Sequence, residues 1–232
     1  MSVSGLKNFI NVLSKMGYNR LLLYTEDTYE VKDEPLFGYM RGRYTVQELK
    51  EIDSYADSKG IELIPCIQTL SHLEQIFYWA PYRSIRDMQD TLLVDEERTY
   101  ELIEHMFATC AEAYKARKIH IGMDEAHYLG LGRYLDKHGF SDRTELFLRH
   151  LNKVCAIAEK YGLKPMMWSD MFFHLAFNKY YTEEGEIPEW VRKKAPKNVE
   201  LVYWDYYSET KELYSAMLEK HLSFDNEILL CV

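Results

Sequence analysis

The sequence predicts an α/β fold of the (β/α)8 barrel type, and three observations predict it. Short apolar segments alternate with helical patterns along the whole chain of 232 residues, an order that is typical of a parallel sheet covered by helices. Polar or aromatic residues follow successive apolar segments directly. No Gly-rich phosphate-binding turn follows any of these segments, which disfavours a nucleotide-binding open sheet.

The elements can be assigned in order from their periodicity. Residues 6–16 have apolar side chains at helical spacing, and residues 19–24 have the pattern of a buried strand. Thr45 and Glu48 form the pattern of a capping box, which begins a helix that runs to about Ser58. The remaining expected elements are helices at 95–114 and 143–161, strands at 61–67, 118–122, 163–168 and 199–204, and a sixth strand pattern at 226–232.

The residues that follow the strands favour a barrel over an open sheet. Barrel enzymes assemble their active sites from the C-terminal ends of several strands, whereas an open sheet binds its ligand at one switch point. Five successive strands end here in carboxylates, a histidine or aromatic residues: Thr25-Glu26-Asp27, Gln68 to His72, Met123-Asp124-Glu125, Ser169-Asp170 and Asp205-Tyr206-Tyr207.

The number of strand–helix units is smaller than a closed barrel requires. Only five or six units are visible, and a closed barrel has eight. We therefore expect one catalytic barrel domain over residues 1–232 that lacks the first strand and the last βα units, as a fragment of a longer chain. The unpaired first and last strands of such a barrel favour association into homo-oligomers.

Composition restricts the partners of the protein. The net charge is −9 and no basic cluster is present, so nucleic acid and anionic membranes are not expected to bind. No membrane-spanning segment or signal peptide is visible. The four cysteines lie far apart in apolar segments and form no disulfide or zinc pattern. Reduced thiols favour a cytoplasmic location.

The adjacent acids Asp124 and Glu125 are the main candidates for catalysis. They lie just past the end of a strand in which His120 and Gly122 share one face. Adjacent acids point in different directions, so burial can keep one protonated while hydrogen bonds keep the other ionised. The alternative is an ordinary acidic pair in the first turn of a following helix.

Several segments together resemble one known family. HIGMDE resembles the H-x-G-x-D-E signature of glycoside hydrolase family 20, the β-N-acetylhexosaminidases. Over residues 6–231 the resemblance continues, in the family's order, through MGYNRLLLYTED, RGRYTVQELKEIDSYADSKGIELIPCIQTLSHLEQ, MMWSD and VYWDYY. It implies a retaining exo-glycosidase that releases terminal β-linked GlcNAc or GalNAc from glycans, with no cofactor and no metal.

The resemblance also implies roles for the two acids. In this family the 2-acetamido oxygen of the substrate attacks the anomeric carbon and forms an oxazolinium ion, in place of an enzymic nucleophile. Glu125 would protonate the leaving oxygen and then activate water. Asp124 would orient the acetamido N–H and stabilise the developing positive charge.

Further residues are assigned to the sugar pocket by the same resemblance. Trp168 would form a wall, Tyr203 would bind the acetamido oxygen, and Asp170 and Asp205 would bind sugar hydroxyls. For Trp168 and Tyr203 the alternative is an ordinary core position.

Two histidines are expected to support the catalytic acids. His72 would hydrogen-bond Glu125 and an acid that follows the preceding strand, either Glu26 or Asp27, with Asp27 preferred. His120 is expected to hold the end of its strand rather than to contact substrate.

Departures from the family pattern leave two other functions open. The family's first-strand arginine and its late tryptophan and acid have no counterpart here, and Met123 stands where the signature usually has glycine. An inactive carbohydrate-binding barrel is therefore one alternative. A metal-dependent barrel hydrolase is another, and its ligands would be His120, Asp124 and His127.

Overall fold

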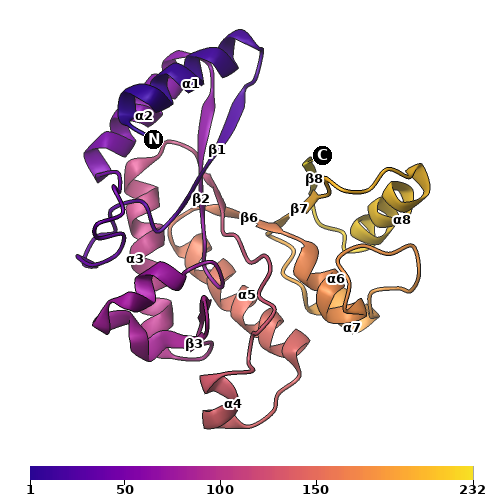
Figure 1. Ribbon diagram of the computed structural model, residues 1–232. Coiled ribbons are helices and arrows are strands. Elements are labelled where there is room, and N and C mark those ends of the chain that lie inside the picture. The colour runs from indigo at the N-terminus through magenta and orange to yellow at the C-terminus, as the bar shows by residue number, and fades with distance from the viewer. Residues whose placement is uncertain (232) are drawn as a thin grey trace.

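The protein is built on one parallel sheet of six strands, as the computed structural model of the chain describes for residues 1–231 (Figure 1). The strands lie side by side in the order in which they occur along the chain, and the sheet curves as part of a barrel wall. They are β1 (Arg20–Glu26), β2 (Glu62–Ile67), β5 (Lys118–His120), β6 (Lys164–Trp168), β7 (Glu200–Trp204) and β8 (Ile228–Cys231).

Helices connect the strands and cover the outer face of the sheet. The larger ones are α1 (Val3–Lys15), α2 (Val46–Ser58), α3 (Glu97–Ala113), α5 (Arg143–Lys160) and α8 (Lys211–Leu222). Shorter elements are α4 (Arg133–His138), α6 (Asp170–Phe177), α7 (Glu189–Lys194) and the 3-10 helices η1 (Glu74–Tyr78) and η2 (Ala80–Ile85). A small antiparallel pair, β3 (Arg86–Met88) and β4 (Thr91–Leu92), follows η2.

The four helices expected from periodicity are present, and so are the six strands, within a few residues. The capping box before α2 is confirmed: the Thr45 hydroxyl accepts a hydrogen bond from the Glu48 amide at 3.1 Å, and the Glu48 carboxylate accepts one from the Thr45 amide at 2.8 Å. The strand expected at 118–122 ends earlier, at His120, because Gly122 and Met123 have φ of 72° and 78° and turn the chain out of the sheet.

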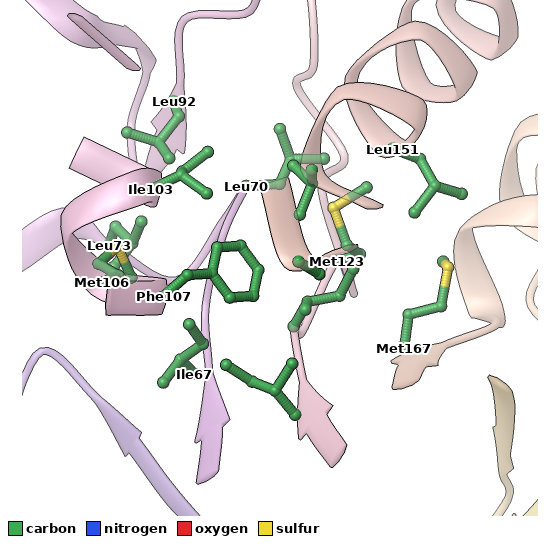
Figure 2. Packing of buried hydrophobic residues seen from close by; sticks show 14 of the residues in the cluster. Ile67, Leu70, Leu73, Leu92, Ile103, Met106, Phe107, Met123, Leu151 and Met167 are labelled. Carbon is green, nitrogen blue, oxygen red and sulfur yellow. The ribbon is translucent and has the colours of Figure 1, made fainter. Parts of the chain in front are cut away.

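The main hydrophobic core lies between the sheet and its helices. Figure 2 shows Ile67 and Met167 from strands and Phe107 and Leu151 from helices packed around Met123. Such burial is the main stabilising contribution to the fold, at about 25 cal/mol per Å² of apolar surface. Met123 is fully buried, so the loop that carries the adjacent acids is fixed to this core by the residue that precedes them.

A second, smaller apolar cluster fills the inner face of the curved sheet. Its buried members are Ile64, Ala116, Met166 and Val202, and Trp168 packs against them. Met166 and Trp168 therefore face the inside of the barrel wall, whereas Met167 between them faces the helices. This alternation decides which side chains reach the site at the carboxyl ends of the strands.

None of the helices in residues 1–231 combines the length and the apolar character that crossing a bilayer requires.

Candidate active site

A cleft of about 450 Å³ opens at the carboxyl ends of the parallel strands. Its lining comes from the carboxyl ends of β1, β6 and β7 and from the segments that follow β2, β5 and β7, as expected for a barrel. Tyr24 and Glu26 come from β1 and the two tryptophans from β6 and β7, with the acids of the loop after β5 from a strand between them. The lining residues are Tyr24, Glu26, His72, Asp124, Glu125, Trp168, Trp204, Tyr206 and Tyr207.

The loop after β5 presents both acids to the cleft through an unusual backbone. Met123 has φ of 78° and Glu125 has φ of 51°, both in the left-handed region that non-glycine residues rarely adopt. Such conformations cost of order 1–3 kcal/mol each and cluster at functional sites. The Asp124 side chain is only 17% exposed and that of Glu125 is 39% exposed, so the two acids occupy different environments.

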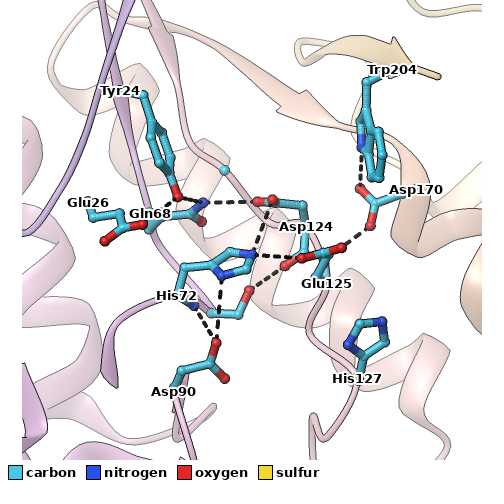
Figure 3. A network of polar contacts seen from close by, with 12 residues as sticks. Tyr24, Glu26, Gln68, His72, Asp90, Asp124, Glu125, His127, Asp170 and Trp204 are labelled. Carbon is cyan, nitrogen blue, oxygen red and sulfur yellow. Dashed lines mark hydrogen bonds and ion pairs between the residues drawn. The ribbon is translucent and has the colours of Figure 1, made fainter. Parts of the chain in front are cut away.

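His72 directs one ring nitrogen, Nε2, toward both acids (Figure 3). Its Nε2 is 3.2 Å from Asp124 Oδ2 and 3.5 Å from Glu125 Oε2. The hydrogen bond to Asp124 raises the pKa of His72 to about 9 against the opposing effect of burial, so the imidazole is cationic at neutral pH. Burial opposes ionisation of Asp124, but His72 and Gln68 more than offset it and hold the pKa of Asp124 below its usual value.

The acid partner expected for His72 is a different residue. Asp90, in the turn between β3 and β4, accepts the backbone N–H of His72 at 2.9 Å and lies 3.8 Å from its Nδ1. Asp27 is buried and binds Arg41 Nε at 3.2 Å. Glu26 faces the cleft and accepts a hydrogen bond from Tyr24 at 3.0 Å. The assignment of Asp27 or Glu26 to His72 is therefore corrected to Asp90.

Asp170 holds other parts of the site instead of lying in the cleft. It is fully buried, and its two carboxylate oxygens accept the Glu125 backbone N–H at 3.1 Å and the Trp204 indole N–H at 3.4 Å. Burial, with the charge of Asp124, raises the pKa of Asp170 to about 7. The expectation that Asp170 binds a sugar hydroxyl does not fit this placement, because both of its oxygens are already used and shielded.

Tyr203 and Asp205 are also placed differently from the expectation. Tyr203 is fully buried on the helix side of β7, where its ring lies 4.7 Å from that of His221. Its hydroxyl donates to Asp205 Oδ2 at 3.1 Å. Asp205 Oδ1 in turn accepts the backbone N–H groups of Tyr207 and Ser208 at 3.0 and 2.9 Å. Both residues therefore shape the loop after β7 and do not line the cleft.

Trp204, its neighbour in the same strand, is the aromatic residue that β7 contributes to the cleft. Strand alternation explains this exchange, since Val202 faces the inner cluster and Trp204 shares its face. Tyr206 and Tyr207 extend the aromatic wall past the strand end. Trp204 has a sequence signal, an aromatic residue at the end of a strand, but Tyr203 beside it has the same signal.

Trp168 and His120 lie where they were expected. Trp168 lines the cleft, and the buried His120 ring packs 4.3 Å from it at 52°. His120 Nδ1 accepts the Gly122 N–H at 3.1 Å, and burial lowers the pKa of His120 to about 4. The imidazole is therefore neutral, and it stabilises the strand end and the back of Trp168 without reaching the cleft.

The metal set considered from the sequence is not assembled. His120 uses Nδ1 to hold Gly122, and His127 bonds the Tyr180 hydroxyl. A different group, His72 with Asp124 and Glu125, has ligand atoms within 4.8 Å of one another. In the structure the His72 imidazole forms ion pairs with both acids, at 3.2 Å from Asp124 and 3.5 Å from Glu125.

Comparison with known proteins identifies the family. The model of the glycosyl hydrolase family 20 catalytic domain matches residues 3–221. Hexosaminidase D of Homo sapiens is 28% identical over 214 residues, which are 88% of this chain and 42% of that protein. Hexosaminidase D of Bos taurus is 29% identical over 203 residues, 82% of this chain and 55% of its own length. The chain thus spans about half the length of these curated relatives.

Solved structures share the fold at low sequence identity. A family 20 exo-β-N-acetylglucosaminidase from Vibrio harveyi superposes with a TM-score of 0.75 at 18% identity, over 99% of this chain and 39% of that one. A family 20 β-N-acetylhexosaminidase from Streptomyces coelicolor A3(2) gives 0.71 at 19% identity, over 100% and 45%. The predicted barrel type, present here as six curved parallel strands, is confirmed. Because the domain match covers most of its residues, the chain belongs to glycosyl hydrolase family 20.

Proposed function

We propose that this chain carries the catalytic centre of an exo-β-N-acetylhexosaminidase, which removes terminal β-linked GlcNAc or GalNAc from glycans by a retaining, substrate-assisted mechanism. The observation that carries the proposal is the unequal treatment of two adjacent acids. Asp124 is partly buried and held ionised by His72, whereas Glu125 is more exposed at the cleft surface. One acid is thus suited to fixed charge and the other to proton exchange.

The geometry suits a sugar that supplies its own nucleophile. An ionised Asp124 can accept the acetamido N–H and stabilise the positive charge that forms as the acetamido oxygen attacks the anomeric carbon. Glu125 donates a proton to the leaving oxygen and later takes one from the attacking water. Water then attacks the anomeric carbon from the face that the leaving group occupied and opens the oxazolinium ion. This second inversion returns the original anomeric configuration.

The cleft itself fits a single pyranose. A volume of about 450 Å³ is at the small end of the range for ligand sites. Trp168 and Trp204 provide apolar surface for a sugar face, and Tyr24 and Glu26 provide hydroxyl partners on the opposite side. This division favours a ligand with one apolar face and polar edges, which is the character of a terminal sugar residue.

The test is hydrolysis of aryl β-GlcNAc and aryl β-GalNAc by the chain, with NMR to identify the first-formed anomer. Glu125→Gln and Asp124→Asn are each expected to lower kcat/KM by about 10²–10⁴-fold. Glu101→Gln, an exposed carboxyl on α3, is the matched control. The β-anomer should appear first.

Four results would contradict the proposal. Rates unchanged by either acid substitution would refute the assigned roles, and the α-anomer would refute retention. Binding of a GlcNAc-derived thiazoline, which mimics the oxazolinium ion, without any turnover by the chain would favour the carbohydrate-binding alternative instead. Loss of activity on chelation would support the metal-dependent alternative.

A further inference from the structure

Asp124 is held from two sides, and the second side involves a neutral residue with no assigned role. His72 binds Oδ2, and Gln68 Nε2 donates to Oδ1 at 3.0 Å (Figure 3). Gln68 follows β2 directly and is fully buried. Both carboxylate oxygens of Asp124 are therefore held in place before any ligand binds, Oδ2 by the charged His72 and Oδ1 by the Gln68 amide.

The orientation of the Gln68 amide is determined by its surroundings. Its two N–H groups have two acceptors, because Nε2 also lies 3.3 Å from the Tyr24 hydroxyl, which itself donates to Glu26 at 3.0 Å. An ionised Asp124 can only accept hydrogen bonds, so an amide turned by 180° would place two oxygens against each other. The chain of donors therefore runs from Gln68 to Asp124 and to Tyr24, and from Tyr24 to Glu26.

This orientation of the amide leaves the Gln68 side-chain oxygen without a hydrogen-bond donor among the residues that the structure describes. Gln68 Oε1 is buried and has no hydrogen-bond partner within residues 1–231. A buried acceptor without a partner is destabilising, and such exceptions occur mainly where function requires them. Gly122 makes the arrangement sterically possible, since a Cβ at that position would lie 2.0 Å from Oε1. The chain thus tolerates an amide oxygen that is unpaired within its described part, and has a glycine beside it, where the amide nitrogen donates to Asp124.

We propose that Gln68 is a positioning residue for the reaction, which fixes Asp124 so that a free lone pair of its carboxylate meets the acetamido N–H of the substrate. This inference rests on the proposed function. Gln68 acts through Asp124 and does not line the cleft. Its amide also favours the charged form of Asp124, together with His72 and against burial.

The ionisation of Asp124 depends on groups from several elements, which must be considered when its titration is measured. The titratable groups that face it are Tyr24 of β1, Cys66 of β2, His72 of the loop after β2, His120 of β5, the adjacent Glu125, Asp170 of α6 and Tyr180. Of these groups only Tyr24 also accepts a hydrogen bond from Gln68, and burial raises the pKa of Tyr24 far above the acidic range. A change in the Asp124 titration at acidic pH therefore reports the loss of the amide donor.

The first test uses Gln68→Met, which keeps the length of the side chain and removes the donor. With aryl β-GlcNAc, kcat is expected to fall about ten- to hundredfold, the range for losing a hydrogen bond to a charged group, with little change in KM. The acidic limb of the pH–rate profile should move to higher pH, because Asp124 loses a group that favours its ionised form. An unmoved limb would overturn the inference.

Thr69→Val is the matched control. Thr69 is equally buried at the same strand end, but its hydroxyl donates to the Ile121 carbonyl at 2.8 Å and not to Asp124. This variant should lose stability without moving the acidic limb. A double variant adds a second check: Gln68→Met should cost nothing further in an Asp124→Asn background, and independent, multiplying losses would contradict an action through Asp124.

A titration of the Asp124 carboxyl by ¹³C NMR separates this inference from the proposed function. In Gln68→Met the titration should shift to higher pH whether or not the chain turns over substrate. A shift in a chain that proves inactive would retain the role of Gln68 and refute the hydrolase. If the wild-type chain is active and Asp124 titrates at the same pH in the wild type and in Gln68→Met, the role of Gln68 alone is refuted.

Discussion

Asp170 has the most strongly shifted pKa among the carboxyl groups of the site, and the substitution Asp170→Asn tests this shift through the free energy of unfolding alone. Asp170 is fully buried, and its pKa is raised from 3.8 to about 7 by burial and by the charge of Asp124. Below pH 3.8 the group is protonated in both the folded and the unfolded chain. Between pH 4 and 7 the unfolded chain loses this proton while the folded chain keeps it, so folding becomes less favourable as the pH rises.

The magnitude follows from the size of the shift. About three pKa units at 1.36 kcal/mol each correspond to about 4 kcal/mol of unfolding free energy lost between pH 4 and 7. Asparagine does not titrate, so the variant escapes this loss. It has a different, pH-independent cost, because its amide cannot accept both the Glu125 and the Trp204 N–H groups.

The assay is urea unfolding of both chains at unit steps from pH 4 to pH 8. The free energy of unfolding of Asp170→Asn minus that of the wild type should rise by about 4 kcal/mol up to pH 7 and then stay level. Asp136→Asn, an exposed position on α4, should run parallel to the wild type. Parallel curves for Asp170→Asn as well would refute the reasoning, since they would mean that Asp170 titrates normally in the folded protein.

Three further substitutions probe the rest of the site. His72→Gln should lower kcat/KM at least tenfold and abolish an alkaline limb near pH 9, because the cation that pairs with Asp124 is lost; an identical pH–rate profile would contradict this. Gly122→Ala should lower the unfolding free energy by about 1–3 kcal/mol in urea unfolding, because of its φ of 72° and the clash with Gln68, and wild-type stability would show that the loop adapts. Trp204→Leu should weaken binding of GlcNAc about three- to tenfold by calorimetry, from a lost stacking contribution of about 0.5–1.5 kcal/mol; unchanged affinity would place the sugar elsewhere.

Periodicity and motif spacing were sufficient for the framework of the protein. Burial imposes a period of two on strands and of 3.6 on helices, so the pattern of apolar residues locates these elements wherever one face is covered. The short helices α4, α6 and α7, the longer helix α8 and the β3–β4 pair were not predicted. The helix α6, with the sequence DMFFHLAF, is apolar on most sides and therefore has little amphipathic pattern to detect.

The site was predictable to the level of the strand ends. Asp124, Glu125, His72 and Trp168 could be placed from the sequence because each follows or ends a recognisable strand. Asp90 could not be, since it comes from a hairpin turn with no strand signal of its own and approaches His72 only through folding.

The sequence by itself determined a parallel α/β barrel wall with polar residues at the ends of its strands and an acidic pair after the strand expected at 118–122. Only the tertiary structure decided which residue of each strand end faces the cleft. A period of two states that Tyr203 and Trp204 face opposite ways, but not which of them faces inward. The curvature of the sheet decides that, and with it Trp204 lines the cleft while Tyr203, Asp205 and Asp170 support it from within the fold.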